Sequence, residues 1–214
     1  MEWRNIILRI SVVVTTYNGK MHLEKQLLSL LQQERAPDEV LIFDDGSTDG
    51  TIELVQSFIR KNCLESWQFY VNAKRKGWKQ NFMEGLRKAA GDILFPCDQD
   101  DIWYPKKLTE MTAVMEQHPE IKLLACDYRV LYEPGALKAT VYKKTPAETQ
   151  GLITRYGFTR HFFMNPYPGC TYAVRRDFFD AVKELWFDGS PHDEFLWLMA
   201  AVQDGAWFYN RVLM

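Results

Sequence analysis

A run dominated by β-branched residues, ISVVVT at 10–15, is the feature that most constrains the fold. A strand without polar alternation must be covered on both faces, which is typical of strands inside a parallel sheet. Similar short runs follow at 40–43, 67–72 and 93–96, and apolar residues recur at helical spacing between them. Strands that alternate with helices at this rhythm predict an α/β fold with a mainly parallel sheet and right-handed crossovers.

The pattern is lost between residues 133 and 168, where polar, aromatic, Pro and Gly residues mix without a period. A stretch of this length without regular structure is often a functional loop or lid, and we expect one here. A strand at 171–174 and helices at 176–186 and 191–203 are predicted after it. The sequence stops inside a last apolar run, AWFYNRVLM, so we expect a C-terminal continuation.

The composition is that of an ordinary one-domain globule, with 214 residues, 47% apolar and 25% charged. The 26 Lys and Arg against 28 Asp and Glu leave a net charge of −2, whereas a general nucleic-acid binder is clearly basic. We therefore expect no nucleic-acid partner. An anionic ligand must instead be bound by a local site.

The four cysteines, Cys63, Cys97, Cys126 and Cys170, form no CxxC pair, which argues against a zinc site and against a disulfide framework. Two of them lie in apolar runs typical of buried, reduced thiols, so a reducing compartment is indicated. The N-terminal residues lack the features of a signal peptide, and no apolar run approaches the ~20 residues that a membrane span needs. We expect a cytoplasmic protein, with peripheral contact at the inner face of the membrane left open.

Polar clusters stand at three strand ends: TTYN at 15–18, DDGS at 44–47 and DQDD at 98–101. A fourth cluster, PGCT at 168–171, directly precedes a strand. Ligands of open α/β sheets lie beyond the carboxyl ends of the strands, so the first three clusters should converge on one crevice. The sequence has no GxGxxG and no GxxxxGK[ST], which leaves NAD-type and P-loop sites without support.

Asp98, Asp100 and Asp101 place three carboxylates within four residues. Their mutual repulsion needs an offsetting cation, and hard oxygen ligands select Mg²⁺ or Mn²⁺, held together with ligand phosphates. The alternative is a solvated acidic turn in which Asp101 caps the next helix, and the turn alone does not decide between them. The DDGS segment is open in the same way: it is either a simple Gly and Ser turn or a carboxylate that accepts hydrogen bonds from a base or ribose.

Together these segments resemble the family 2 glycosyltransferases of the GT-A fold. The resemblance rests on five motifs in the family's order: ISVVVTTYNG at 10–19, VLIFDDGSTDGT at 40–51, GWKQNF at 77–82, AAGDILFPCDQDDIWYPKKL at 89–108 and PHDEFLWLMAA at 191–201. DQDDIW with the later HDEFLW looks most like the rhamnosyltransferase branch of surface-polysaccharide enzymes. The resemblance implies a central, mainly parallel sheet flanked by helices. It also implies one catalytic domain, with a nucleotide-binding part at about 9–132 and an acceptor-side part at about 133–214.

The family pattern implies a role for each matching residue of the nucleotide-binding part. Thr15, Tyr17 and Asn18 match the first nucleotide-contacting loop. Asp45, with Asp44 beside it, matches the carboxylate that hydrogen-bonds the pyrimidine base.

The remaining matches concern the metal, the diphosphate and the catalytic base. Asp98 and Asp100 match the DxD motif, whose Mg²⁺ or Mn²⁺ bridges to the diphosphate of the donor, so Asp98 also counts as nucleotide-binding. Many members carry Ala-Arg-Asn where this chain has KQN at 79–81, and Lys79 is the candidate to replace that Arg. Asp193 matches the catalytic base, and its alternative is an acidic residue favoured at a helix start by the helix dipole.

The resulting hypothesis is a metal-dependent, inverting glycosyltransferase of cell-surface polysaccharide biosynthesis. It would use a UDP- or dTDP-linked sugar and a saccharide or lipid-linked saccharide acceptor. A nucleotidyltransferase is the alternative enzyme, although TTYNGKMH at 15–22 lacks the Gly-rich, basic loop of that class. A non-catalytic sugar-nucleotide-binding module is the non-enzyme alternative. Of the neighbouring residues, we expect Lys106 and Lys107 to be solvated, while Trp103 either stacks on a sugar or anchors the next helix.

Overall fold

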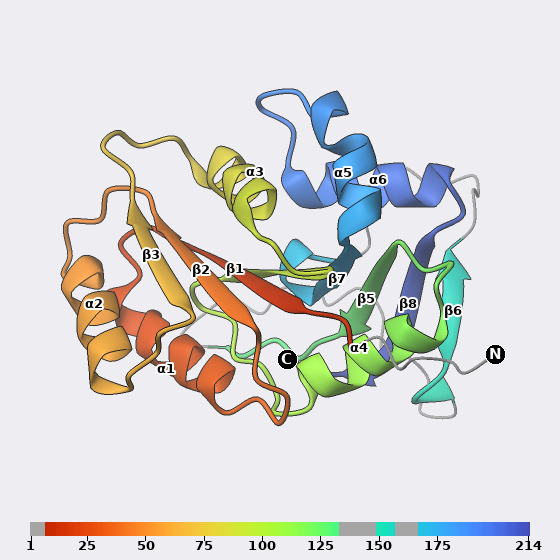
Figure 1. The fold of residues 1–214 in the computed structure, drawn as a ribbon, viewed down its shortest axis with the longest axis horizontal. Helices are drawn as coiled ribbons and strands as arrows, with labels where there is room; N and C mark the ends of the chain where they lie inside the picture. The colour runs from red at the N-terminus through yellow and green to blue at the C-terminus, as the bar shows by residue number, and fades with distance from the viewer. Residues whose placement is uncertain (1–6, 133–148, 157–166) are drawn as a thin grey trace.

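The computed structural model describes residues 7–132, 149–156 and 167–214, and within them eight strands form one sheet (Figure 1). The strands are β1 (Ile10–Thr16), β2 (Glu39–Asp44), β3 (Trp67–Val71), β4 (Ile93–Asp98), β5 (Leu123–Asp127), β6 (Ile153–Tyr156), β7 (Tyr172–Arg175) and β8 (Ala206–Val212). Their order across the sheet is β3-β2-β1-β4-β7-β5-β8-β6. Neighbours among β1 to β4 pair in parallel, as do β5 and β8. By contrast, β7 and β6 run antiparallel to their neighbours.

Helices cover both faces of the sheet, so the molecule has three layers (Figure 1). The helices are α1 (Lys20–Leu31), α2 (Thr51–Lys61), α3 (Trp78–Lys88), α4 (Lys107–Gln117), α5 (Arg176–Val182) and α6 (His192–Val202), with two 3₁₀ turns, η2 (Gly169–Thr171) and η3 (Lys183–Leu185). One face is covered by α1, α2 and α4, and the other by α3, α5 and α6.

The β-branched run of β1 follows from this layering. Val12 and Val14 point into the core beneath α1, α2 and α4, whereas Val13 points into the core beneath α3, α5 and α6. All three side chains are fully buried. Because successive side chains of a strand point to opposite faces, a central strand between two apolar cores cannot alternate with polar residues.

The strands and helices that were predicted around the polar clusters are confirmed, with two differences in the second half. The sequence also predicts a strand from Leu123 to Leu131, and the strand formed there, β5, already ends at Asp127. The stretch at 133–168, expected to lack regular structure, contains the edge strand β6, which pairs antiparallel with β8. A four-residue strand at a sheet edge, with exposed Thr154 and Arg155, buries too few side chains to produce a clear period. Residues 133–148 and 157–166, where a lid was expected, lie outside the described residues.

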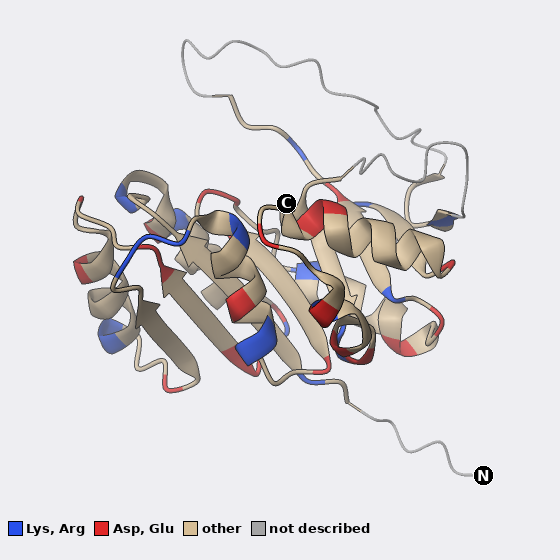
Figure 2. Ribbon diagram, turned by 90° about the horizontal axis from the view of Figure 1, so that it is seen from above, with Lys and Arg blue, Asp and Glu red and all other residues tan. Residues whose placement is uncertain are grey.

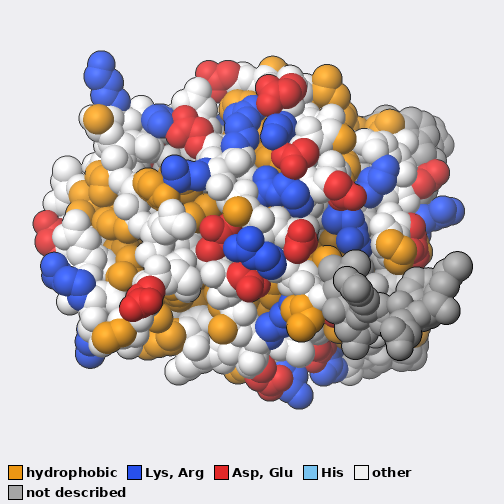
Figure 3. All heavy atoms as spheres, viewed as in Figure 1, with side chains coloured by type: hydrophobic (Ala, Val, Ile, Leu, Met, Phe, Trp, Pro, Cys, Tyr) orange, Lys and Arg blue, Asp and Glu red, His pale blue; other side chains and the backbone are white. Residues whose placement is uncertain are grey.

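Charged residues of both signs occur on the elements of both helical layers (Figure 2). On the face shown in Figure 3, basic and acidic side chains are interspersed. An anionic ligand is therefore recognised by individual side chains rather than by a broad field. None of the described helices has the length and apolar character needed to cross a bilayer.

Candidate active site

The polar clusters that follow β1, β2 and β4 meet at one cavity of about 250 Å³, which confirms their predicted convergence. Parallel strands end at the same edge of a sheet, and β1 lies between the other two. The cavity is lined by Thr15, Thr16, Tyr17, Asp45, Arg75, Gly77, Trp78, Asn81, Asp98, Gln99 and Asp100. Five of the predicted site residues are among them: Thr15, Tyr17, Asp45, Asp98 and Asp100.

Asp44 and Asn18 lie outside this lining, in the framework behind it. The buried Asp44 carboxylate accepts hydrogen bonds from Thr16 Oγ1 (2.8 Å), from the main-chain N–H of Gly46 (3.0 Å) and of Ser47 (2.7 Å), and from Ser47 Oγ (2.5 Å). Asn18 adopts a positive φ of 47°, and its Oδ1 accepts the N–H of Thr48 at 2.9 Å. Both residues join the end of β1 to the turn after β2.

Asp45 holds a loop across the cavity. Its carboxylate accepts the main-chain N–H of Lys76 (2.7 Å) and of Gly77 (2.8 Å) and the side-chain N–H of Asn72 (3.0 Å). Only 3% of Asp45 is exposed. The loop between β3 and α3 is thereby fixed at the cavity, and Arg75 lies on it.

Arg75 is the one basic side chain in the described lining of the cavity, and sequence reasoning missed it. Its guanidinium lies over the Tyr17 ring, 3.9 Å from the ring centroid, and Nε lies 3.9 Å from Asp45 Oδ2. Lys79, expected to serve the diphosphate, instead donates a hydrogen bond to the carbonyl of Gly189. The basic run KRK at 74–76 was the available signal, but a basic run in a loop is more often a solvated surface.

Gln99 joins the loop after β4 to the loop after β1. Its Oε1 accepts the N–H of Tyr17 at 2.9 Å, and its Nε2 donates to the Tyr17 carbonyl at 3.3 Å. A Cβ at Gly19 would lie 2.1 Å from Gln99 Oε1, so this close approach requires glycine. The residue between Asp98 and Asp100 is therefore a structural connection, and its two neighbours face the cavity.

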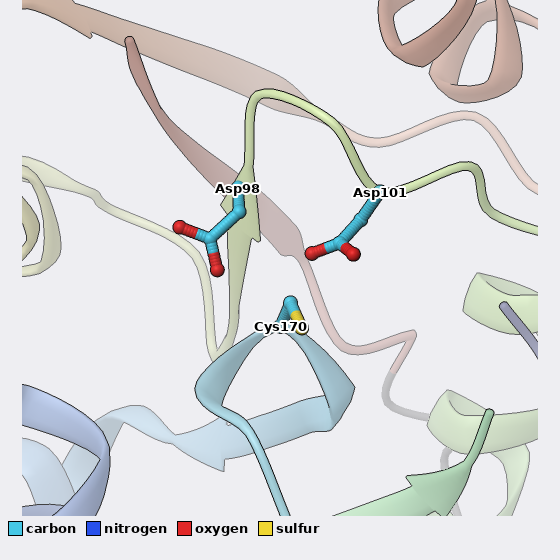
Figure 4. A group of neighbouring side chains, drawn as sticks. All are labelled: Asp98, Asp101 and Cys170. Carbon is cyan, nitrogen blue, oxygen red and sulfur yellow. The ribbon is translucent and has the colours of Figure 1, made fainter. Parts of the chain in front are cut away.

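The acidic turn, defined here as Asp98, Asp100 and Asp101, receives a third element from the second half of the chain. Because β7 runs antiparallel to β4, the chain enters β7 at the edge where β4 ends, and η2 lies there. One ligand atom each from Asp98, Asp101 and Cys170 lies within 4.8 Å of the others. Figure 4 shows Asp98 at the end of β4, Asp101 on the loop that follows, and Cys170 on the neighbouring turn.

The carboxylates of the acidic turn are short of compensating charge. Burial, and then the charges of Asp101, Asp100 and Asp193, raise the pKa of Asp98 to about 7. Burial also raises the pKa of Asp101, while the hydrogen bond with Cys170 and the charge of Lys107 oppose that rise. A carboxylate with such a pKa in the ligand-free protein is stabilised in its ionised form when a cation binds.

The acidic turn fits a hard divalent cation. Asp98 and Asp101 lie close together, whereas the exposed Asp100 reaches two cavities. The expected pair was Asp98 and Asp100, so the structure adds Asp101 as a neighbour of Asp98. Burial raises the pKa of the Cys170 thiol well above its usual range, and a protonated thiol is a poor metal ligand. The donor atoms are thus carboxylate oxygens, which Mg²⁺ and Mn²⁺ prefer.

A second cavity, of about 570 Å³, lies on the other side of the acidic turn. Asp98 and Asp100 line both cavities. The rest of its described lining is more apolar: Asp101, Ile102, Tyr104, Tyr128, Arg129, Val130, Leu131, Pro168, Cys170 and Met214. A ligand in the first cavity and a ligand in the second would meet at the carboxylates of β4.

Asp193 lies on the first turn of α6, close enough for its charge to raise the pKa of Asp98. The first turn of α6 packs directly on η2, because a Cβ at Gly169 would lie 3.0 Å from Asp193 Cβ. The Asp193 carboxylate accepts the N–H of Glu194 at 2.9 Å. Glu194 itself is exposed and lines a different cavity with Phe187 and Leu198. Of the two adjacent carboxylates, Asp193 is thus the one next to the acidic turn.

His192 is a buried, neutral residue of the α6 base. Its ring stacks on Phe82 at a centroid distance of 4.1 Å, and in the described structure neither ring nitrogen has a hydrogen-bond partner. Burial lowers the pKa of His192 to about 4, against the opposing charge of Asp193. This packing gives His192 a structural role at the start of α6.

The structure decides two expectations about residues that follow the acidic turn: the one for Lys107 is wrong, and one of the two alternatives for Trp103 is supported. Lys107, expected to be solvated, is fully buried. Its Nζ donates to the carbonyl of Cys170 at 2.5 Å, because α4 begins beneath η2. Trp103 is 2% exposed and packs on Phe95, so it anchors the segment before α4.

The sequence match to known proteins covers most of the chain. The family model described as "Glycosyl transferase family 2" matches residues 11–180. The dTDP-rhamnosyl transferase RfbG of Shigella flexneri is 24% identical over 92% of this chain and 68% of its own length. The poly(ribitol-phosphate) beta-N-acetylglucosaminyltransferase TarS of Staphylococcus aureus is 30% identical over 72% of this chain but only 26% of TarS.

Solved structures share the fold. Residues 1–349 of S. aureus TarS in complex with UDP match with a TM-score of 0.72 at 20% identity, over 96% of this chain and 59% of that one. The mannosyltransferase PcManGT from Pyrobaculum calidifontis, in complex with GDP-Man and Mn²⁺, matches with a TM-score of 0.67 at 19% identity, over 96% of this chain and 54% of that one. These likenesses establish the GT-A fold that the sequence predicted. With the family match over 11–180, they show that the chain belongs to glycosyltransferase family 2.

Proposed function

We propose that the protein transfers a sugar from a nucleoside-diphosphate sugar to an acceptor hydroxyl, with inversion at the transferred carbon and with a divalent cation. The observation that carries this proposal is the position of the acidic turn, which lies between two cavities and whose Asp98 pKa is raised to about 7. An under-compensated carboxylate group at such a boundary is suited to hold a cation where a donor and an acceptor meet.

The donor nucleotide is assigned to the cavity at the ends of β1, β2 and β4. Tyr17 offers a ring and Thr15 a hydroxyl there. Asp45 fixes the loop that carries Arg75, and Arg75 brings a positive charge to a lining that otherwise holds three carboxylates. An anionic diphosphate needs that charge together with the cation.

Asp98 and Asp100 are proposed to hold Mg²⁺ or Mn²⁺, with Asp101 behind them. A bound divalent cation stabilises the negative charge that develops on the leaving diphosphate. The chain's own residues do the remaining work on the donor: Gln99 fixes the turn against the Tyr17 loop, and Arg75 meets the phosphate oxygens.

The acceptor is assigned to the second cavity, and Asp193 is proposed as the general base. Proton removal from an acceptor hydroxyl requires a carboxylate near the acidic turn but on the acceptor side. Asp193 meets the first condition through its electrostatic contact with Asp98. The helix start favours its ionised form, which is the form that accepts a proton. Attack from the side opposite the leaving diphosphate inverts the sugar carbon.

The names of the relatives suggest the substrates. RfbG is a dTDP-rhamnosyl transferase, and TarS was crystallised with UDP-GlcNAc. We therefore propose a dTDP- or UDP-linked hexose as donor and rhamnose as one candidate sugar. The proposed acceptor is a saccharide or lipid-linked saccharide of a cell-surface polysaccharide, modified in the cytoplasm or at the inner face of the membrane.

Calorimetric titration of the protein with UDP and with dTDP, in Mn²⁺ and in EDTA, tests the proposal. We expect at least one nucleotide to bind about tenfold or more tightly with Mn²⁺, because the cation links carboxylates to phosphates. Asp100→Asn should remove most of that difference. Asp204→Asn is the matched control, since Asp204 is exposed, lies outside the lining of both cavities and has a positive φ that Asn tolerates. Equal wild-type affinity in Mn²⁺ and in EDTA, for both nucleotides, would contradict the metal assignment.

A further inference from the structure

The Lys107 ammonium group is buried and held by neutral groups. Its Nζ lies 2.5 Å from the Cys170 carbonyl oxygen, 3.6 Å from Met214 Sδ and 3.8 Å from the centroid of the Trp103 ring. The side chain is 0% exposed. An ammonium group has three N–H donors, and a carbonyl, a thioether and an aromatic face are three groups that can receive them. Among the described residues, no carboxylate oxygen lies within 4 Å of Nζ.

A buried charge without a paired counter-charge is strongly unfavourable unless opposite charge lies nearby. The acidic turn supplies that charge. Cys170 lies between the two: its carbonyl oxygen accepts the bond from Lys107, and its side chain hydrogen-bonds with Asp101. Cys170 thus contacts Lys107 through its carbonyl and lies beside Asp98 and Asp101 through its thiol, and the charge of Lys107 acts on Asp101.

We propose that Lys107 is the internal counter-ion of the acidic turn, and that it weakens the hold of the free site on the divalent cation while strengthening its hold on the diphosphate. This inference rests on the proposed function. A fixed positive charge behind the carboxylates repels Mn²⁺ or Mg²⁺ and attracts phosphate oxygens. Lys107 is therefore a positioning residue that sets the electrostatic balance of the site without touching either ligand.

The proposal predicts that removing the Lys107 charge changes the affinities for the cation and for the nucleotide in opposite directions. Lys107→Met removes the charge and retains an unbranched side chain of similar length. We expect its affinity for Mn²⁺ alone to rise about tenfold and its affinity for UDP or dTDP in EDTA to fall about threefold to tenfold. A merely structural role would lower both affinities, because a distorted turn binds neither ligand well. Mn²⁺ binding is measured from the electron paramagnetic resonance signal of the free ion, and nucleotide binding by calorimetry.

Two further variants control the experiment. Lys106→Met changes the exposed neighbour, which lies outside the lining of both site cavities, and should leave both affinities within about twofold of wild type. Lys107→Gln is also neutral but keeps an N–H donor for the Cys170 carbonyl, so it should shift both affinities in the same directions as Lys107→Met. Thermal unfolding in EDTA verifies that each variant is folded.

The outcomes separate this inference from the proposed function. Suppose that the wild type binds Mn²⁺ and that the affinity for Mn²⁺ is unchanged or lower in both neutral variants. This result would contradict the counter-ion role of Lys107 but not the proposed function. Loss of cooperative unfolding in both neutral variants also overturns the counter-ion role, because Lys107 would then be a packing residue. Wild-type protein that binds no Mn²⁺, with or without nucleotide, overturns the proposed function as well.

Discussion

The pair Asp44 and Asp45 at the end of β2 and the acidic turn at the end of β4 differ in how their carboxylates are compensated. Asp44 and Asp45, after β2, accept hydrogen bonds from main-chain and side-chain donors on both sides. Asp98 and Asp100, after β4, receive neither a hydrogen bond nor an ion pair on their carboxylates from any described residue. The carboxylates of the first turn are therefore satisfied within the protein, whereas those of the second keep their oxygens available to a ligand.

We propose that the same difference separates a structural carboxylate from a ligand-binding one. Both turns lie at strand ends, and both are rich in Asp and therefore look alike as sequence. The distinguishing quantity is the number of donors that the fold already directs at each oxygen. Asp45 has features of both groups. Its carboxylate accepts hydrogen bonds from the loop at 72–77, and the residue also lines the cavity at the ends of β1, β2 and β4.

The largest effect is expected at Asp193, which extends the comparison to the acceptor side. Asp193→Asn keeps the shape of the side chain but removes the proton acceptor. Donor and Mn²⁺ binding should survive, while sugar transfer falls by roughly 10²–10⁴-fold, the usual contribution of a general base. Transfer is measured with radiolabelled donor and an acceptor preparation.

Glu194→Gln is the matched control for that variant. Glu194 is the next residue but lines a different cavity, so its loss should leave transfer near normal. A larger loss in Glu194→Gln than in Asp193→Asn would move the role to Glu194. Near-normal transfer in Asp193→Asn would remove Asp193 from the mechanism.

The second effect is a change in the free energy of unfolding. Substitutions at Asp44 and at Asp98 should change it in opposite directions. Asp44→Ala leaves buried N–H and O–H donors without acceptors and should lower the free energy of unfolding by about 3 kcal/mol. Asp98→Asn in EDTA relieves repulsion between buried carboxylates and should raise it by about 1 kcal/mol. Urea unfolding at pH 7.5 measures both, and a destabilising Asp98→Asn would contradict the contrast between the turns.

The smallest effect is the pH dependence of the free energy of unfolding, to which Asp98 and His192 contribute in opposite directions. The folded-state pKa of Asp98, about 7, lies above its ordinary 3.8, so its stabilising contribution is present at low pH and is lost as the pH rises towards 7. The folded-state pKa of His192, about 4, lies below its ordinary 6.5, so its contribution is present above 6.5 and is lost as the pH falls to 4. Between pH 4 and 6.5 the two slopes have opposite signs.

Wild-type stability in EDTA should therefore change by only about 1 kcal/mol through these two groups across that range. Asp98→Asn leaves the His192 contribution unopposed, so the stability of this variant should rise more steeply with pH than that of the wild type. Identical pH profiles for the two proteins would show that Asp98 titrates normally.

The sequence predicted the first half of the fold closely because its central strands are buried on both faces. β1, β2 and β4 carry continuous apolar runs, and the polar residues that end them mark the site directly. β6 was missed because an exposed edge strand of four residues has no such run. The antiparallel pairing of β7 with β4 brings Cys170 to Asp98 and Asp101. This pairing joins residues far apart in the sequence, so local patterns do not predict it.

Within the site, residue identity was easier to predict than residue environment. The acidic turn was found from its spacing, but whether Asp44 lines the cavity or supports it depends on which donors surround it. Arg75 and Lys107 were misjudged for the same reason, since a basic residue in a loop or helix start is usually solvated. Only the folded chain shows that one lies on Tyr17 and that the other is buried beneath η2.

The paired hydrogen bonds between Gln99 and the Tyr17 main chain have a consequence for protein engineering. Because of these bonds, and because a Cβ at position 19 would collide with Gln99, the loops at 17–19 and 98–101 should be exchanged together. A chimera that takes its DxD segment from a relative without Gln at the middle position must import that relative's β1 loop as well. Exchanging both segments together should preserve donor binding, whereas exchanging either one alone separates the two halves of the cavity.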